Sequence, residues 1–282
     1  MNKYVSSLAF YGKTPEEIVS IAKEYKFAIE FSSGMPYRPD MEQFFNETQL
    51  KKILHNYFPA PKEPFVLNLA SANEAIRNKS IKHCLNGIKI SALNGCPFFA
   101  AHAGFCIDPS PNDLGNHLKL ENDFDVDYNL ELFFESLGVL ISHAESQKVQ
   151  FLIENNVLAS FNFKDSISPL LCCESKDIIK VFEHFKYSDY FGLLLDTAHL
   201  KVSCQTMKLN ITKELEKISN YIKALHHSDN NGEIDNNLPI KNDYWFLPHL
   251  KNYAVLPQVL EVKKSSISSI IDQLQLLEIY GN

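Results

Sequence analysis

Short hydrophobic runs alternate with longer amphipathic segments along most of the chain. Eight of these runs are rich in leucine, β-branched and aromatic residues, a composition typical of buried strands. The predicted strands are residues 4–10, 27–31, 65–69, 97–101, 149–153, 190–195, 222–225 and 254–260.

Between the strands the hydrophobic period changes to that of helices. Thr14 and Glu17 have the spacing of a capping box ahead of the first helix, and Ser71 and Glu74 repeat it ahead of another, which Gly95 ends. Further helices are predicted at residues 127–145, 176–185, 208–221 and 265–280.

The regular alternation of strand and helix predicts the fold. Eight successive β-then-α units favour an α/β protein of the (β/α)8 TIM barrel type over a doubly wound sheet, which would have fewer units in this length. No proline-rich or glycine-rich linker divides the sequence. We therefore expect one domain over residues 1–282.

Four predicted strands end on a side chain that can bind a cation. Glu154, Asp196 and His226 each close a hydrophobic run, and Glu261 closes the last one. In a parallel barrel the carboxyl ends of the strands meet at one mouth, where active sites of this architecture lie. Because carboxylate oxygens and imidazole nitrogens hold divalent cations, four such residues in succession predict a metal site.

The charge composition argues against a nucleic-acid partner. The net charge is -7, and among 27 basic residues only Arg38 and Arg77 are arginine. Duplex binding relies on many phosphate contacts from a clustered basic face. We therefore expect a small-molecule substrate and no tight binding of DNA or RNA.

The sequence also indicates a compartment. No apolar run approaches the roughly 18 residues that a membrane helix needs, and the first residues lack the basic and apolar regions of a secretory leader. The six cysteines show no Cys-x-x-Cys spacing, as expected for reduced thiols. These features predict a soluble cytoplasmic protein without a membrane partner.

Two polar segments interrupt the alternation after the fourth and fifth predicted strands, at residues 105–126 and 157–175. Long loops at the mouth of a barrel commonly form lids or substrate walls. Contact with a second copy of the chain is the alternative, so a homo-oligomer stays open. Trp245, after the seventh strand, is expected either to stack on a sugar face or to anchor packing.

Several short motifs, in order along most of the chain, resemble the xylose-isomerase-like TIM barrel superfamily. This superfamily includes sugar isomerases, ketose 3-epimerases and endonuclease IV, so a resemblance to it implies the fold more directly than the reaction. The motifs are VLNLAS at 66–71, AHAG at 101–104, LIEN at 152–155, LDTAH at 195–199, HHSDN at 226–230 and LEV at 260–262.

The resemblance implies a metal set. Glu154, Asp196, His226 and Glu261 are similar to the ligands of one divalent ion in the isomerase and epimerase branch. Three carboxylates and one imidazole favour manganese, magnesium or cobalt, with zinc as the alternative.

The resemblance also implies roles for three nearby residues. His102 and His199 are expected to contact substrate, or to bind a second metal ion if the chain is similar to endonuclease IV, and Trp245 is a candidate for the substrate wall. His227 should point away from His226 across the strand and is expected to be structural.

Departures from the two branches limit what the resemblance implies. Endonuclease IV-like proteins carry a histidine near the third strand and an Asp-x-His after the seventh, and the matching positions here are predicted to be Lys62 and Asp235-x-Asn237. Both changes remove a nitrogen ligand. Ketose epimerases often have an arginine six positions after the metal-binding histidine, where this chain has Gly232.

The predicted ligands indicate a reaction in carbohydrate metabolism. A cation that chelates a hydroxy-ketone acidifies the neighbouring C–H, and Glu154 and Glu261 could then move a proton through a cis-enediolate. We therefore predict a metal-dependent isomerase or epimerase acting on a sugar or related polyol. The alternatives are an endonuclease IV-like phosphodiester hydrolase, and a dehydratase or biosynthetic tailoring enzyme with the same metal site.

Overall fold

Eight parallel strands form the centre of the molecule. The computed structural model describes residues 2–32, 34–119, 124–165, 167–186 and 188–282. Hydrogen bonds connect the strands in the order β3-β2-β1-β8-β7-β6-β5-β4. The strands are β1 (Lys3–Ser6), β2 (Ile29–Phe31), β3 (Lys52–Leu54), β4 (Phe98–His102), β5 (Gln150–Glu154), β6 (Phe191–Asp196), β7 (Ile222–His227) and β8 (Gln258–Leu260).

The two end strands, β3 and β4, meet and close the barrel. They are joined by an isolated parallel bridge between His55 and Ala100, where the amide of Asn56 donates to the Ala100 carbonyl oxygen at 2.7 Å. The predicted (β/α)8 TIM barrel in a single domain is therefore confirmed.

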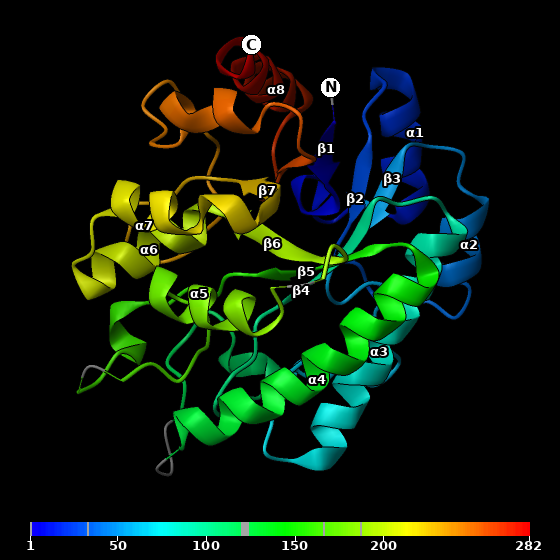
Figure 1. The fold of residues 1–282 in the computed structure, drawn as a ribbon. Helices are drawn as coiled ribbons and strands as arrows, with labels where there is room; N and C mark the ends of the chain where they lie inside the picture. The colour runs from blue at the N-terminus through cyan, green and yellow to red at the C-terminus, as the bar shows by residue number, and fades with distance from the viewer. Residues whose placement is uncertain (1, 33, 120–123, 166, 187) are drawn as a thin grey trace.

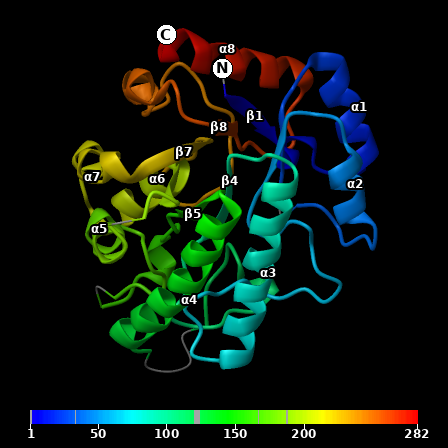
Figure 2. The same ribbon diagram turned by 45° about the vertical axis from the view of Figure 1, so that its right-hand side comes forward.

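Helices surround the strands, as Figure 1 shows. The long helices α3 and α4 lie side by side on one flank, and α8 lies close to the N-terminal strand (Figure 2). Within the described residues no helix combines the length and apolar character needed to cross a membrane. The helices are α1 (Pro15–Tyr25), α2 (Met41–Glu47), α3 (Glu74–Leu93), α4 (Val126–Gln147), α5 (Ser175–His184), α6 (Thr197–Met207), α7 (Ile211–Ile218) and α8 (Ile267–Gly281).

The capping residues explain where two helices begin. The box predicted at Thr14 and Glu17 is confirmed, since each residue's side chain bonds the other's backbone amide. The box predicted at Ser71 and Glu74 is wrong. Asn73 caps α3 instead, because its side-chain oxygen accepts from the first turn, and asparagine is as good a cap as serine.

Three predicted strands differ most from the structure. The last strand is Gln258–Leu260, so residues 254–257 of its predicted range lie outside it. The third strand is Lys52–Leu54, and the segment predicted in its place, residues 65–69, is not a strand. That segment is apolar because Val66 and Leu67 line a cavity at the barrel mouth. The first strand ends at Ser6, since Ser7–Phe10 forms a 3-10 turn.

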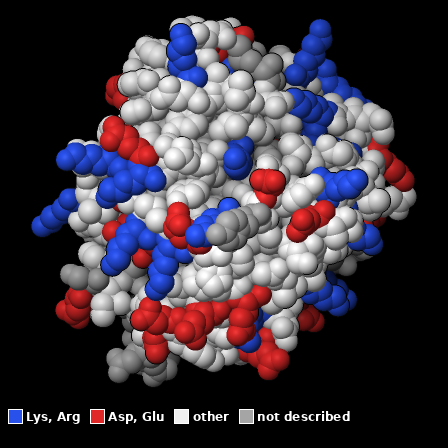
Figure 3. All heavy atoms as spheres, viewed as in Figure 1, with Lys and Arg blue, Asp and Glu red and all other residues white. Residues whose placement is uncertain are grey.

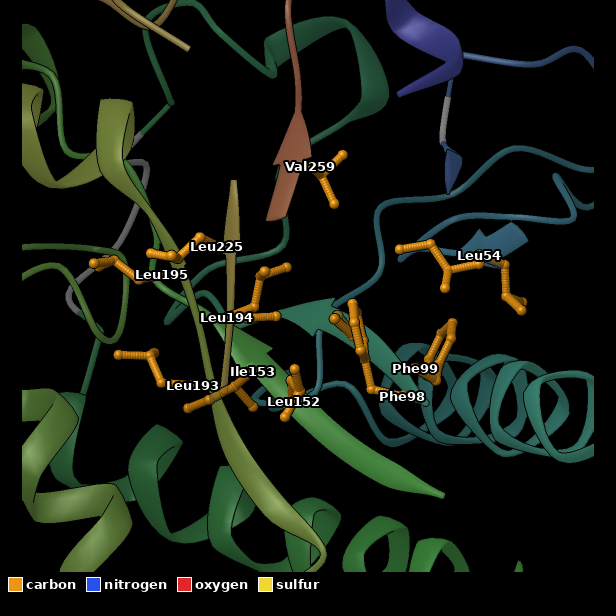
Figure 4. Packing of buried hydrophobic residues seen from close by; sticks show 14 of the residues in the cluster. Leu54, Phe98, Phe99, Leu152, Ile153, Leu193, Leu194, Leu195, Leu225 and Val259 are labelled. Atoms are coloured by element: carbon orange, nitrogen blue, oxygen red, sulfur yellow. The ribbon is translucent and has the colours of Figure 1, made fainter. Parts of the chain in front are cut away.

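Aliphatic side chains of neighbouring strands make up much of the core. Figure 4 shows Leu193, Leu194 and Leu195 of β6 near Leu225 of β7 and Leu152 of β5, and all five are fully buried. Strands buried on both faces have continuous hydrophobic runs. The polar residues of these strands are thereby concentrated at the carboxyl ends. The six cysteines are buried as free thiols.

Candidate metal centre

The four residues predicted as metal ligands lie together at the barrel mouth. Glu154, Asp196 and His226 stand at or near the ends of β5, β6 and β7, and Glu261 directly follows β8. Parallel pairing sets Asp196 beside His226 in adjacent strands. One ligand atom from each residue lies within 4.8 Å of the others, a spacing that one cation can span.

Three carboxylates surround one nitrogen of His226. Its Nδ1 lies 3.0 Å from Glu261 Oε2, 3.4 Å from Glu154 Oε1 and 3.9 Å from Asp196 Oδ2. Burial opposes the charged form of this imidazole, but the carboxylates around it raise the pKa of His226 well above its ordinary value. The cluster thus attracts positive charge at this point.

Unpartnered oxygens indicate that the cluster fits a cation. Both carboxylate oxygens of Glu154 and Oδ2 of Asp196 are buried and accept no hydrogen bond of good geometry. A buried carboxylate oxygen that accepts no hydrogen bond has lost its bonds to water without replacement, which costs about 1 to 3 kcal/mol. A divalent ion among these oxygens would supply the missing interactions.

Glu30, at the middle of β2, holds the other side of His226. Its Oε2 accepts from Nε2 of the imidazole at 2.9 Å, and both side chains are fully buried. Metal-binding histidines commonly donate their second ring nitrogen to a carboxylate, which fixes the ring and leaves the first nitrogen for the metal. Glu30 was not predicted from the sequence, because a single glutamate inside a hydrophobic strand forms no motif.

Three further imidazoles surround Glu154. His55 Nε2 lies 2.9 Å from Glu154 Oε2, His102 Nδ1 lies 3.4 Å from the same oxygen, and His199 Nδ1 lies 3.7 Å from Oε1. The ligand atoms of His102, Glu154 and His199 form a second group close enough to hold one ion. Burial opposes ionisation of Glu154, but the imidazoles of His102, His55 and His226 hold the pKa of its carboxyl well below its usual range.

His55 corrects one sequence assignment. The position of the histidine near the third strand was predicted to be Lys62, but the structure brings His55, directly after β3, to Glu154. The error follows from the misplaced third strand. Once β3 is located, His55 shows the same signal as the four predicted ligands, namely an ionisable residue at a strand end.

His199 is fixed between two elements. Asp196 Oδ1 caps α6 by accepting from the amides of Ala198 and His199, both at 2.8 Å. The His199 ring contacts the Asn155 carbonyl oxygen through Nδ1 at 2.9 Å, and Nε2 lies 3.3 Å from Asp235 Oδ2. His199 and Asp235 therefore stand at the edge of the centre, as their positions after β6 and β7 require.

Trp245 packs beside Thr197, the residue after Asp196. Its indole nitrogen donates to the Thr197 carbonyl oxygen at 3.2 Å, its ring packs edge-on against Phe246, and it is not among the described residues that line the mouth cavity. This is the packing arrangement that the sequence left open beside substrate stacking. His227 is fully buried, and its Nδ1 lies 3.0 Å from the Tyr244 hydroxyl, as expected for a structural residue.

A cavity of about 510 Å³ opens beside this cluster. His102, His199 and Asp235 line it, so the cavity borders the imidazoles that contact Glu154. Burial lowers the pKa of His102, and the nearby imidazoles lower it too. The Glu154 carboxylate acts in the opposite direction, and the resulting pKa is about 4. The ring is therefore neutral at pH 7, the form in which a histidine binds a metal or accepts a hydrogen bond.

Comparison with known proteins gives the family. The sequence profile of the xylose isomerase-like TIM barrel matches residues 10–263, which is most of the chain. The chain belongs to this family. The resemblance predicted from the sequence motifs is thereby confirmed. Membership of this family implies that the chain is an enzyme.

Individual relatives of the chain within this fold differ in activity. A protein of Aquifex aeolicus (strain VF5) named probable endonuclease 4 is 26% identical over 236 residues, covering 78% of this chain and 75% of that protein. Among solved structures, a D-tagatose 3-epimerase-like protein superposes with a TM-score of 0.75 at 19% identity, covering 99% of this chain and 97% of its own. The TTHB071 protein of Thermus thermophilus, soaked with ZnCl2, has a TM-score of 0.67 at 18% identity, covering 98% of each chain.

Proposed function

We propose that this protein is a divalent-metal-dependent isomerase or epimerase acting on a hydroxy-carbonyl compound of the sugar or polyol class. The observation that carries the proposal is the convergence of Glu154, Asp196 and Glu261 on Nδ1 of His226, whose opposite nitrogen is bonded to Glu30. This is a cation site with a fixed imidazole and an excess of oxygen ligands.

The metal would be held by Glu154, Asp196, His226 and Glu261. A bound divalent cation supplies Lewis acidity that polarises a substrate carbonyl. The oxygen-rich donor set supports manganese, magnesium or cobalt, with zinc as the alternative. Glu30 orients the imidazole, and its distance of 196 residues from His226 in sequence means that the folded barrel is needed to make the pair.

Glu154 and Glu261 would transfer the proton. They come from opposite ends of the β5 to β8 row of strands and approach His226 at 3.4 Å and 3.0 Å. A substrate between them would present one face of its carbon to each carboxylate, so that one removes a proton and the other returns it. His102 and His199, which line the adjoining cavity, would bond the substrate oxygens.

Two epimerase structures share the fold of this chain. The D-tagatose 3-epimerase-like structure covers nearly the whole chain, and a D-psicose 3-epimerase from Clostridium cellulolyticum H10 superposes with a TM-score of 0.64. Both are below 25% identity, so they share the fold and leave the reaction to the site.

A second candidate is a phosphodiester hydrolase, and His55 is the observation that favours it. His55 lies 2.9 Å from Glu154, and its ligand atom also groups with those of Glu30 and His226, next to the group of His102, Glu154 and His199. More than one ion could therefore be held at this mouth. The relative named probable endonuclease 4 agrees with this alternative. The net charge of -7 counts against a DNA substrate. On the face in Figure 3, basic side chains are scattered and acidic ones gather in a lower patch, and the described residues form no continuous basic surface there.

The test combines a metal count with a proton-transfer assay. Protein loaded with Mn²⁺ should hold one ion per chain, and it should exchange a substrate C–H with deuterated solvent when supplied with ketohexoses or their derivatives. The Glu261→Gln variant keeps an oxygen for the metal and loses the base, so turnover should fall by about 10² to 10⁴-fold with a much smaller effect on substrate binding.

The opposite results are equally specific. Two or three ions per chain, together with incision of an abasic duplex that His55→Ala abolishes, would replace the isomerase proposal by the hydrolase. Full activity of Glu261→Gln would leave that carboxylate as a ligand only.

A further inference from the structure

The cavity beside the metal centre has a mainly apolar wall. The loops that follow β3, β4 and β5 contribute most of its residues, and its volume of about 510 Å³ is in the range that holds a drug-sized ligand. The larger apolar side chains that line it are Tyr57, Phe65, Phe105, Leu118, Phe161 and Leu170.

Two of the polar side chains along this wall are already engaged. Asn156 Nδ2 donates to the Ala103 carbonyl oxygen at 2.8 Å and to the Leu171 carbonyl oxygen at 2.9 Å. Asn162 Oδ1 accepts from the Leu118 amide at 2.9 Å. These hydrogen bonds hold the loops together, so the Asn156 side-chain nitrogen and the Asn162 side-chain oxygen are used within the protein.

The remaining polar groups lie at the metal end of the cavity. His102 lies 3.4 Å from Glu154, His199 lies 3.7 Å from it, and Asp235 contacts His199. Asn56, the residue after His55, has a buried side-chain oxygen without a partner. The cavity is thus polar at the metal centre and apolar beyond it.

No lysine or arginine is among the described residues that line the cavity. Phosphate groups are commonly bound by such side chains or by helix N-termini. A free sugar, with hydroxyl groups around its whole surface, would lose hydrogen bonds to water along an apolar wall without replacement, which costs free energy for each group.

We infer that the substrate is amphipathic: one end carries the vicinal oxygens that face the metal centre, and the other is an apolar body that fills the cavity. The inference rests on the proposed function, whose substrate class it narrows from a free or phosphorylated sugar to a hydroxy-carbonyl or polyol derivative bearing an alkyl, acyl or aryl group.

Two exposed side chains at the edge of the cavity agree with this class. Leu114 is 47% exposed and Ile234 is 43% exposed, and both line the cavity. Large apolar side chains gathered around an opening are typical of a ligand-binding site. They offer additional apolar contact to a ligand that extends toward solvent.

A homologous series of hydroxamic acids tests the inference. Each member chelates a divalent ion through the same two oxygens, and only the alkyl chain changes. Calorimetric titration of Mn²⁺-loaded protein with aceto-, butano-, hexano- and octanohydroxamic acid should show affinity rising by about fourfold per buried methylene until the cavity is filled. The affinity of the same acids for free Mn²⁺ is the reference, and the metal content of the protein is measured after each titration.

Variants at the cavity edge make the test specific. Leu114→Asp and Ile234→Asp place a charge at the opening without disturbing the core. They should flatten the dependence of affinity on chain length, with each variant's affinity for acetohydroxamic acid as its own reference. Ile167→Asp is the matched control, because Ile167 is 51% exposed and is not among the residues lining the cavity. It should behave as the unaltered protein.

The outcomes separate the two proposals. Failure to bind Mn²⁺, or to bind any hydroxamate when loaded, contradicts the metal centre and the proposed function. Metal-dependent binding of all four acids with equal affinity keeps the metal centre and overturns the amphipathic substrate. If affinity rises equally steeply with chain length in the control and in the edge variants, the amphipathic substrate is also overturned, since the alkyl chain would then lie elsewhere.

Discussion

Metal binding should stabilise the fold through Asp196, and an asparagine at this position tests the site with little structural change. Asp196→Asn keeps the Oδ1 atom that caps α6 and replaces Oδ2, which is buried without a hydrogen-bond partner. Alanine would also remove the cap, at a cost of about 1 kcal/mol that has nothing to do with metal. The asparagine variant therefore isolates the charged ligand.

The expected magnitude follows from ligand linkage. A metal at about 100 times its dissociation constant stabilises the native state by about 2.7 kcal/mol. At about 2 °C per kcal/mol for a chain of this size, the melting temperature should rise by about 5 °C. If loss of the carboxylate weakens binding about a hundredfold, the variant is half-saturated and gains only RT ln 2, about 0.4 kcal/mol or about 1 °C.

The assay is thermal unfolding with and without Mn²⁺, followed by circular dichroism, with bound metal measured by mass spectrometry. Asp229→Asn is the matched control at the same mouth, because Asp229 pairs with Lys201 at 2.6 Å and lies outside the cluster. It should keep the full metal-dependent rise. The same rise in Asp196→Asn as in the unaltered protein, at equal metal content, would refute the assignment of Asp196 as a ligand.

Two further predictions concern the scaffold. A methyl group on Gly104 would lie 2.4 Å from Ala70 Cβ, so Gly104→Ala should lower the free energy of unfolding in urea by about 1 to 3 kcal/mol. Gly138 on α4 faces open space, so Gly138→Ala should raise the free energy of unfolding by about 1 kcal/mol. Equal effects of the two substitutions would contradict the packing of Gly104 against Ala70. Burial opposes ionisation of Glu214, but its bonds to Lys217 and to a backbone amide lower its pKa in the folded protein from 4.5. The stability that the ionised Glu214 contributes is therefore fully present above pH 4.5, and it is lost as the pH falls through the lower pKa of the folded state. Glu214→Gln should therefore cost about 1 kcal/mol at pH 7 and progressively less in acid, and a cost that does not change between pH 7 and pH 3 would exclude the ion pair.

The sequence predicted the barrel because its two periods are regular and its strands are buried on both faces. The same regularity predicted Glu154, Asp196, His226 and Glu261, since each follows a hydrophobic run long enough to recognise. β3 has only Lys52–Leu54 and begins with a lysine, so its pattern was weaker than that of the nearby cavity wall.

Residues whose role depends on side-chain direction were not predictable in this way. Glu30 lies inside a strand and meets His226 only when the sheet closes, and no local pattern records which face of β2 is turned to the barrel interior. His55 was missed for a different reason, because its strand was misplaced. The apolar cavity was also missed, since it is assembled from loops whose sequences show no common period.

The pairing of Glu30 with His226 has a consequence for the order of assembly. The two residues are 196 positions apart, and the centre combines them with Glu154, Asp196 and Glu261 from intervening and later strands. A nascent chain cannot form this cluster before its last strand has joined the first. Under the proposed function, the cation would therefore bind at the end of folding, after the ring of strands is complete, and a partly synthesised chain would have the ligands without the site.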